Sequence, residues 1–177
     1  MSLVSTDWLD KNLNEVKIID ASWHLVKNRN AIKEYNKEHL ENAIFFNLDK
    51  NSNKKKNLPH GHFLPSASDH EKSISEMGIL NTDRIIIYCY SDLISSCRAW
   101  FQFLYFGHNP KLVSVLNGGM KKWKLEKKKV TSKKTKIIPS KYIAKENKNM
   151  IKIKSEVDKN IKEKKFTILD ARSRNRF

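Results

Sequence analysis

Cys89 is the residue whose type and position best suit chemistry. It follows residues 84–88, Arg-Ile-Ile-Ile-Tyr, whose continuous apolar run is typical of a central strand in a parallel sheet. Catalytic and ligand-binding groups gather at the carboxyl ends of such strands, and loop amides with a helix start can stabilise a thiolate. The alternative is that Cys89 fills the strand end, because cysteine is among the residue types most often buried.

The loop after Cys89, residues 89–95, favours this structural alternative. It contains neither glycine nor arginine, whereas a compact anion cradle needs glycine to direct several amides to one point. The carboxylate of Asp92 would disfavour a thiolate, and Arg98 is the only nearby arginine to offset it. Cys97, in the first turn of the next predicted helix, is interpreted as a packing residue. We therefore keep Cys89 as a catalytic candidate and expect a structural role for it.

Three of the six arginines, Arg172, Arg174 and Arg176, lie in the last six residues. They follow a predicted strand, where a guanidinium cluster suits an anionic substrate; a solvated tail is the equal alternative. His60 and His62 could form a metal pair, but no acidic residue or cysteine stands at zinc-site spacing. We therefore predict no metal or cofactor and treat both histidines as loop residues.

Short apolar strands alternate with amphipathic helices along the sequence. This order predicts an α/β fold, an open parallel sheet with helices on both faces. Residues 22–34 show no clear period and are predicted as loop. Strands are predicted at residues 16–20, 43–47, 84–89, 112–116 and 166–171. Helices are predicted from residues 5–7, at 35–40, 69–77, 95–105 and 153–161, and after Gly119.

Two Asp-Ala pairs, at Asp20 and Asp170, each end a predicted strand that follows a helix. This domain-sized repeat predicts two copies of one domain. We expect a first domain at residues 1–125, a Lys-rich linker at 126–149, and the truncated start of a second copy at 150–177. Each carboxylate could be functional, although a strand-end aspartate more often accepts hydrogen bonds from the backbone amides of a neighbouring loop.

The net charge of +16 invites a nucleic-acid hypothesis. The chain, however, has 29 lysines against 6 arginines, together with 17 asparagines, spread from end to end. This composition indicates a sequence-wide bias rather than a binding face, so we predict no specific nucleic-acid partner. No apolar run approaches the ~20 residues of a membrane span. With only two cysteines and no signal sequence, we expect a cytoplasmic protein.

Several segments together resemble the rhodanese family, most closely its two-domain 3-mercaptopyruvate and thiosulfate sulfurtransferases. Residues 18–21, Ile-Ile-Asp-Ala, are similar to the first strand of the family. The other matching segments are residues 35–48, similar to Tyr-x-x-Gly-His-Ile-Pro-Gly-Ala-x-Phe-Phe-Asp, residues 88–108, similar to the first-domain loop and helix, residues 113–123, similar to Leu-Asp-Gly-Gly-x-x-x-Trp, and residues 169–177, similar to Asp-Ala-Arg-x-x-x-Arg-Phe.

The resemblance implies a rhodanese-like fold and sulfane-sulfur transfer from thiosulfate or 3-mercaptopyruvate, through a cysteine persulfide, to a thiol or cyanide. It implies that Arg172 and Arg176 help to bind the small anionic donor. Two-domain members carry the nucleophile in the second domain, near position 239 in this numbering, so we expect the chain alone to be inactive. A rhodanese-like binding module without catalysis is the alternative.

The sequence departs from the family in two places. Glu41 and Asn42 replace a Pro-Gly pair, so the turn after His39 must be built differently. Cys89 stands where first domains commonly carry aspartate and where second domains carry the nucleophile, but its loop does not resemble Cys-Gly-Ser-Gly-Val-Thr. The position therefore suits catalysis and the loop does not.

Overall fold

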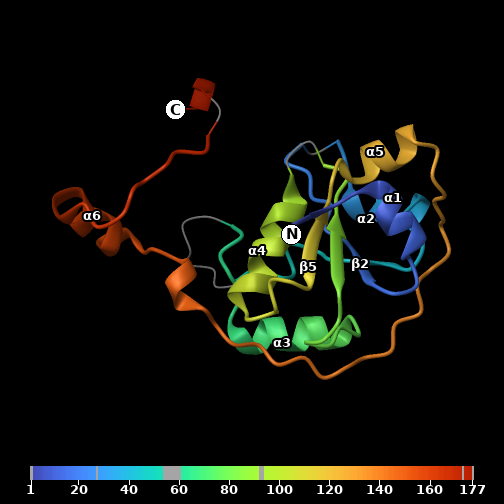
Figure 1. Cartoon of the computed structure of the whole chain (residues 1–177), viewed down its shortest axis with the longest axis horizontal. Helices are drawn as coiled ribbons and strands as arrows, with labels where there is room; N and C mark the ends of the chain where they lie inside the picture. Colours follow the sequence, from blue (N-terminus) through green and yellow to red (C-terminus); the bar gives the residue numbers. More distant parts are fainter. Residues whose placement is uncertain (1, 27, 54–60, 92–93, 173, 177) are drawn as a thin grey trace. The chain divides into compact units, whose positions relative to one another are not determined.

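The computed structural model describes residues 2–26, 28–53, 61–91, 94–172 and 174–176. The chain forms two compact units, Met1–Asn147 and Lys148–Phe177 (Figure 1). No helix in the described part of the chain is long and apolar enough to cross a bilayer. The first unit contains the sheet and Cys89.

Among the described residues, five parallel strands form the centre of the first unit, in the order β1-β5-β4-β2-β3. This arrangement confirms the predicted open parallel sheet. Every residue of β4 and β5 is buried, which accounts for their continuous apolar runs. The two residues of β1 are too few for a periodic pattern, so the sequence did not predict this strand. The strands are β1 (Leu3–Val4), β2 (Lys17–Asp20), β3 (Ala43–Phe45), β4 (Ile85–Tyr88) and β5 (Val113–Leu116).

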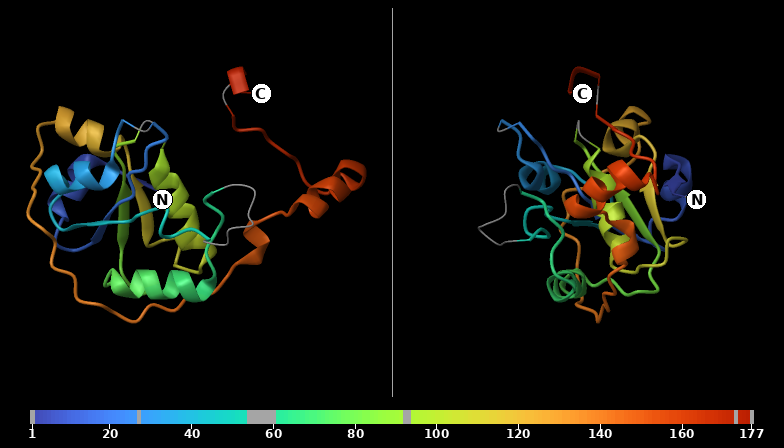
Figure 2. Two further views of the ribbon diagram at one scale, coloured as in Figure 1. Left: turned by 180° about the vertical axis from the view of Figure 1, so that it is seen from behind. Right: turned by 90° about the vertical axis from the view of Figure 1, so that its left-hand side faces the viewer.

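Helices cover both faces of this sheet (Figures 1 and 2). Ile19, Ile85 and Ile87 face a core shared with α3 and α4. Ile18 and Ile86 face the opposite core, which α1, α2 and α5 cover. The alternation of neighbouring residues between two cores is the period of a strand buried on both sides. The helices are α1 (Thr6–Lys11), α2 (Ala31–Lys37), α3 (Ala67–Glu76), α4 (Ser95–Tyr105) and α5 (Gly119–Leu125).

Helix α2 begins at Ala31, inside the stretch 22–34 that was predicted as loop. Asn30 caps it by accepting a hydrogen bond from the Lys33 amide at 3.0 Å. No residue of α2 is buried, so the helix lacks the apolar period that would reveal it. In the turn that follows, Asn42 takes a φ of +61°, which asparagine adopts more readily than most residues and which replaces the Pro-Gly turn.

Most of the predicted linker, residues 126–147, belongs to the first unit, which extends to Asn147 rather than ending at residue 125. The amides of Ser140 and Tyr142 donate to the carbonyl and the hydroxyl of Ser75, each at 2.9 Å. The side chain of Tyr142 is fully buried. An extended segment anchored by one buried aromatic residue has no period in its sequence, so its packing could not be predicted.

The second unit contains α6 (Lys154–Glu163) and 3₁₀ turns at Lys148–Met150 and Arg174–Arg176. The strand predicted at residues 166–171 is wrong, because these residues pair with no described strand. The backbone of Phe166 instead bonds the Asn160 side chain, accepting from Nδ2 at 2.8 Å and donating to Oδ1 at 3.0 Å. A strand needs neighbours to satisfy its backbone groups, and the sequence pattern alone cannot supply them.

Candidate functional site

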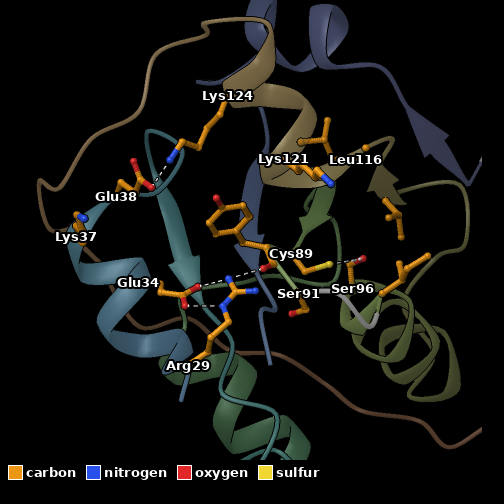
Figure 3. A pocket seen from close by; sticks show the side chains of 15 residues that line it. Arg29, Glu34, Lys37, Glu38, Cys89, Ser91, Ser96, Leu116, Lys121 and Lys124 are labelled. Carbon is orange, nitrogen blue, oxygen red and sulfur yellow. Dashed lines mark hydrogen bonds and ion pairs between the residues drawn. The ribbon is translucent and has the colours of Figure 1, made fainter. Parts of the chain in front are cut away.

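A pocket of about 770 Å³ lies at the carboxyl end of β4 (Figure 3). This volume is in the range of small-molecule sites. Figure 3 shows Cys89 in the middle of the view, with α5 above it and α2 to one side. The lining includes Arg29, Tyr90, Ser96 and Lys121 together with Cys89. The carboxyl end of β4 is therefore hollowed, as expected of a parallel sheet.

The turn between β5 and α5 brings the chain against Cys89. Gly118 and Gly119 have φ angles of +85° and +54°, in the left-handed region that glycine adopts readily. The Met120 amide donates to the Cys89 carbonyl at 3.1 Å. A Cβ atom on Gly119 would lie 2.5 Å from that carbonyl oxygen. Glycine at position 119 therefore permits the close approach that positions α5 beside Cys89.

The thiol of Cys89 is close to the start of α4. Cys89 is 9% exposed, and its Sγ donates to Ser96 Oγ at 3.4 Å. The N-cap residue of α4, Ile94, provides no side-chain acceptor for the first-turn amides. Cys97 is exposed, so its interpretation as a packing residue is wrong. Desolvation nevertheless raises the pKa of the Cys97 thiol, which disfavours its thiolate.

Two serines tie the loop after β4 to the loop after β2. The Tyr90 amide donates to Ser22 Oγ at 2.8 Å, and the Trp23 amide donates to Ser91 Oγ at 2.8 Å. The Tyr90 amide is the first one after the cysteine, and this bond makes it unavailable to an anionic sulfur. The two serines therefore hold the loop in place, and the Tyr90 amide cannot at the same time donate a hydrogen bond to an anion.

Arg29 supplies a guanidinium group that the sequence did not reveal. Its Nε and Nη2 donate to the two carboxylate oxygens of Glu34 at 2.9 and 2.7 Å, and Nη2 also donates to the Tyr90 carbonyl at 2.9 Å. The hydrogen bond from Arg29 lowers the pKa of Glu34, so this carboxylate stays ionised. Arg29 lies in the aperiodic stretch 22–34, where nothing in the sequence connects it to Cys89.

Arg98, the arginine expected to lie near Cys89, has other partners. It donates to Gln102 Oε1 at 3.1 Å and to the His62 carbonyl at 3.0 Å. Within the described part of the chain, Arg98 does not line the Cys89 pocket. Asp92, which was expected to oppose a thiolate, lies outside the described residues. The described charge beside Cys89 therefore comes from other residues than the sequence suggested.

Lysines from α2 and α5 add positive charge to the pocket. Lys124 pairs with Glu38, and its Nζ lies 5.5 Å from the centre of the Tyr90 ring. Lys37 and Lys121 also line the pocket, and neither forms an ion pair with a described carboxylate. Among the described residues, the lining contains four cationic side chains and two glutamates, which together carry a net charge of +2.

The family of Rhodanese-like domains matches residues 5–126, which is more than half of this chain. The chain belongs to this family. It is 32% identical to the thiosulfate sulfurtransferase of Rattus norvegicus over 184 residues, and 33% identical to thiosulfate/3-mercaptopyruvate sulfurtransferase 2 of Arabidopsis thaliana over 199 residues. Both alignments cover 99% of this chain, with 61% of the rat protein and 57% of the plant protein. The chain therefore spans about three fifths of the length of such curated relatives.

A crystal structure from Escherichia coli, described as a 3-mercaptopyruvate sulfotransferase with the rhodanese fold, superposes with a TM-score of 0.90. Its sequence is 27% identical, and the match covers 99% of this chain and 67% of that one. The match agrees with the parallel sheet described above and with the predicted rhodanese-like fold.

The arginines that follow the rhodanese-like domain lie in the second unit. Arg172 donates from Nε to both Asp170 oxygens, at 2.9 and 2.8 Å. These bonds lower the pKa of the Asp170 carboxyl. Arg176 lies in the 3₁₀ turn Arg174–Arg176. The predicted binding of an anionic donor by Arg172 and Arg176 stays a prediction.

A second polar constellation in the rhodanese-like domain joins His62 to Asp49, with Nε2 and Oδ1 2.7 Å apart. Trp23 Nε1 donates to the same Asp49 oxygen at 3.1 Å, and its ring meets the His62 ring edge-on at 4.7 Å. His62 has a φ of +66°, unusual for a residue with a side chain. A partly exposed imidazole oriented by a carboxylate can carry a proton.

His62 was predicted to be a loop residue because no acidic residue or cysteine stands at zinc-site spacing from it. Its carboxylate partner, Asp49, is thirteen positions away, a spacing that matches no motif. The strained backbone and the paired carboxylate were not visible in the sequence. His60, the other member of the suggested metal pair, lies outside the described residues. Among those described, no group of three or more His, Cys, Asp or Glu side chains could hold a metal ion.

Asp20 has the structural role that its strand-end position suggested. It is 4% exposed, and its Oδ1 accepts a hydrogen bond from the Ser22 amide at 2.9 Å. Burial raises the pKa of this carboxyl, and the hydrogen bonds from Ser22 partly oppose that effect. Asp20 therefore holds the start of the loop whose serine binds the Tyr90 amide.

Proposed function

We propose that this chain is part of a rhodanese-type sulfurtransferase that uses thiosulfate or 3-mercaptopyruvate as donor. The supporting observation is the alignment with relatives named for these activities, which continues past residue 126 and covers 99% of the chain. Both the domain and the second unit thus have counterparts in sulfurtransferases. The acceptor that we propose is a thiol or cyanide.

The proposed reaction has two steps. A cysteine thiolate attacks the sulfane sulfur of thiosulfate, a new S–S bond forms, the S–S bond of the donor breaks, and sulfite leaves. Cyanide or a thiolate then attacks the outer sulfur of the persulfide, which gives thiocyanate or a new persulfide and restores the cysteine. Hydrogen bonds to the charged sulfur stabilise the intermediate, so the loop around the cysteine decides its efficiency.

We propose that Cys89 is not this nucleophile and that residues 1–177 alone transfer little sulfur. The Cys89 thiol is nearly buried and bonded to Ser96, and the next amide, that of Tyr90, is bonded to Ser22. These contacts leave few donors for a persulfide anion. We place the nucleophile in the second copy of the domain, near position 239, beyond the present sequence.

Intact mass spectrometry tests this assignment. Purified chain is incubated with thiosulfate or 3-mercaptopyruvate, with Cys89→Ser as the matched control. We expect no stoichiometric gain of about one sulfur atom, roughly 32 Da, because the thiol lacks an anion cradle. A full adduct that is absent from the Cys89→Ser variant would show that Cys89 carries sulfur and that our assignment is wrong.

Thiocyanate formation tests the activity itself. It is measured with thiosulfate or 3-mercaptopyruvate as donor and cyanide as acceptor, for residues 1–177 and for the polypeptide expressed with the downstream codons of its gene. We expect background rates for the former and turnover for the latter. Absence of turnover with both donors in the longer polypeptide would argue against a sulfurtransferase and favour the second candidate, a rhodanese-like binding module.

The Cys89 pocket is the observation that favours the binding module, since it is large, preformed and cationic.

Both cysteines are unpaired thiols. We propose a reducing, cytoplasmic location on this basis, and thiol-specific labelling of the protein in intact cells followed by mass spectrometry would test it. Recovery of either cysteine in an oxidised form would count against that location.

A further inference from the structure

Residues 127–145, here called the lysine strap, cross the end of the first unit that lies opposite the Cys89 pocket. Figure 1 shows them in orange, passing α3 along the lower edge of the view. Thr135 and Lys136 line a groove together with Val16 and Arg84, which precede β2 and β4. Cys89 follows the last residue of β4. The strap and the Cys89 pocket are therefore at opposite ends of the parallel sheet.

The backbone of the lysine strap is held in place along its length. The amides of His39 and Thr131 each donate to the carbonyl of the other at 2.8 Å. The Asn81 side chain bonds both backbone groups of Ile143, donating to its carbonyl at 2.8 Å and accepting from its amide at 2.9 Å. Between these points, the side chain of Tyr142 is fully buried. The exposed side chains of the strap thus project from a fixed backbone, so a partner need not order it first.

The lysine strap is more basic than the chain as a whole. It contains eight lysines and no aspartate, glutamate or arginine. Seven of the eight lysines are exposed, whereas Lys128 is partly buried and pairs with Asp7. The groove beside the strap contains Glu15 and Asp83 together with three cationic side chains, so these carboxylates do not cancel the charge. The strap therefore presents a positive surface potential.

Large apolar side chains stand among these lysines. Ile137, Ile138 and Ile143 are 41%, 73% and 61% exposed. Leu80, which is 44% exposed, adjoins them, because the next residue, Asn81, bonds the backbone of Ile143. Exposed apolar side chains that gather on one surface mark an interaction site. The strap thus combines exposed isoleucines with a cluster of ammonium groups.

We propose that the lysine strap binds the chain to the surface of an anionic phospholipid bilayer. The ammonium groups meet the lipid phosphates, and Ile138 and Ile143 insert their side chains at the boundary between headgroups and acyl chains. Such a peripheral contact needs no membrane-spanning helix. Because the Cys89 pocket is at the other end of the sheet, it stays open to the aqueous phase.

The composition of the strap favours a bilayer over a nucleic acid. Nucleic-acid binding uses arginine forks and exposed aromatic rings that stack on bases. The strap has no arginine, and its only aromatic residue, Tyr142, is buried. Exposed isoleucines contribute nothing to phosphate binding in water, but they gain free energy at a bilayer interface.

This inference goes beyond the proposed sulfur transfer, because it concerns the surface on which the chain is held and not the reaction that it serves. Vesicle binding requires neither a sulfur donor nor Cys89. Either proposal can therefore fail without the other.

Cosedimentation of residues 1–177 with lipid vesicles tests the proposal. Vesicles of equal parts phosphatidylglycerol and phosphatidylcholine should bind the chain at least about tenfold more tightly than vesicles of phosphatidylcholine alone. Ile138→Ser combined with Ile143→Ser should weaken binding to the anionic vesicles about fivefold. The matched control, Leu25→Ser with Leu125→Ser, removes two similarly exposed apolar side chains outside the strap and should bind as the parent does.

Lysine variants separate the strap from the overall charge of the chain. Lys134→Gln combined with Lys141→Gln should weaken binding to the anionic vesicles about 20-fold, because both ammonium groups lie near the lipid phosphates. The control pair, Lys33→Gln with Lys50→Gln, lowers the net charge equally at exposed positions outside the strap. It should change binding less than about twofold, because salt screens charges far from the bilayer.

NMR of the ¹⁵N-labelled chain in anionic bicelles that contain a spin-labelled lipid identifies the residues at the bilayer. The amide signals of Ile138, Lys141 and Ile143 should broaden, and those of Cys89 and Gly118 should not. The spectrum of each variant also reports whether it is folded, so a loss of binding cannot be mistaken for unfolding.

Equal binding to both kinds of vesicle, equal losses in the strap and control variants, or broadening centred on Cys89 would overturn the proposal. Full retention of vesicle binding by the isoleucine variant, with equal affinity for duplex DNA, would also overturn it. That result would show a general polyanion-binding surface instead of a bilayer contact.

Discussion

The same dipeptide, Asp-Ala, makes the same local turn in two different surroundings. Asp20 Oδ1 accepts the Ser22 amide at 2.9 Å, and Asp170 Oδ1 accepts the Arg172 amide at 2.9 Å. Asp20 is buried, and its pKa is raised by desolvation. Asp170 is exposed, and the hydrogen bond from Arg172 lowers its pKa. The turn is thus a property of the sequence, whereas the electrostatics of each carboxyl depend on its surroundings.

The residues before each aspartate differ even more. Strand β2 is paired on both sides, with β3 and with β4. Residues 166–170 have a similar apolar pattern but pair with no described strand, and Leu169 is 85% exposed. A side chain can select a turn two residues away, but a strand exists only when its neighbours satisfy its backbone.

The largest expected effect on stability comes from removing the carboxylate of Asp20, and removal of the Asp170 carboxylate is the comparison. Asp20→Ala should lower the free energy of unfolding by about 2–3 kcal/mol, because it leaves the buried Ser22 amide without an acceptor. Asp170→Ala should leave the melting temperature of the protein unchanged, since water replaces the lost bonds. Urea unfolding followed by tryptophan fluorescence measures the first effect, and calorimetry compares the two variants. Equal destabilisation by both would show that the two turns have equivalent surroundings.

A lower pH should also distinguish the two units, because it should destabilise the first unit through His70. Burial lowers the pKa of His70 to about 3, from an ordinary value of 6.5. Between these values the unfolded chain binds a proton that the folded chain does not, so stability is lost as the pH falls. The loss from this residue should be about 2 kcal/mol between pH 7 and pH 5. The second unit has no histidine.

His70→Phe is the control for this effect, because phenylalanine can keep the stacking on Phe106, whose ring centre lies 4.1 Å away. The pH dependence of urea unfolding between pH 7 and pH 5 should be weaker in this variant than in the parent. An unchanged slope would show that other groups, such as His108, whose pKa burial also lowers, dominate the acid response.

The sequence predicted the parts of this molecule whose side chains repeat with a clear period. β4 and β5 are buried on both faces, and α4 buries six of its side chains, so each stood out. Helix α2 buries none and was missed in part. Packing of the segment before Asn147 depends on the single buried Tyr142, which no pattern reveals.

The candidate site was predictable only at its centre. Cys89 follows a strongly periodic strand, so its place at the sheet edge could be inferred. Arg29 and Lys121 reach the same pocket from distant, aperiodic or solvent-facing positions. Their convergence results from the parallel topology, which gathers the loops after β2, β4 and β5 at one edge.

The smallest expected effect is that of deleting residues 148–177 on the stability of the first unit. Both buried cores of that unit consist of residues before Asn147, and the last segment of the unit is anchored by its own bonds to Ser75 and Phe106. The melting temperature of residues 1–147 should therefore match that of the whole chain within about 1 °C.

Limited trypsin digestion should release the Lys-rich second unit first and leave a resistant fragment that ends near Asn147, as measured by mass spectrometry. A fragment that ends near residue 125, or a second unit that resists trypsin, would contradict this division. The first result would support the predicted linker at residues 126–149. The second result would mean that the exposed residues 166–170 pair with other strands in solution.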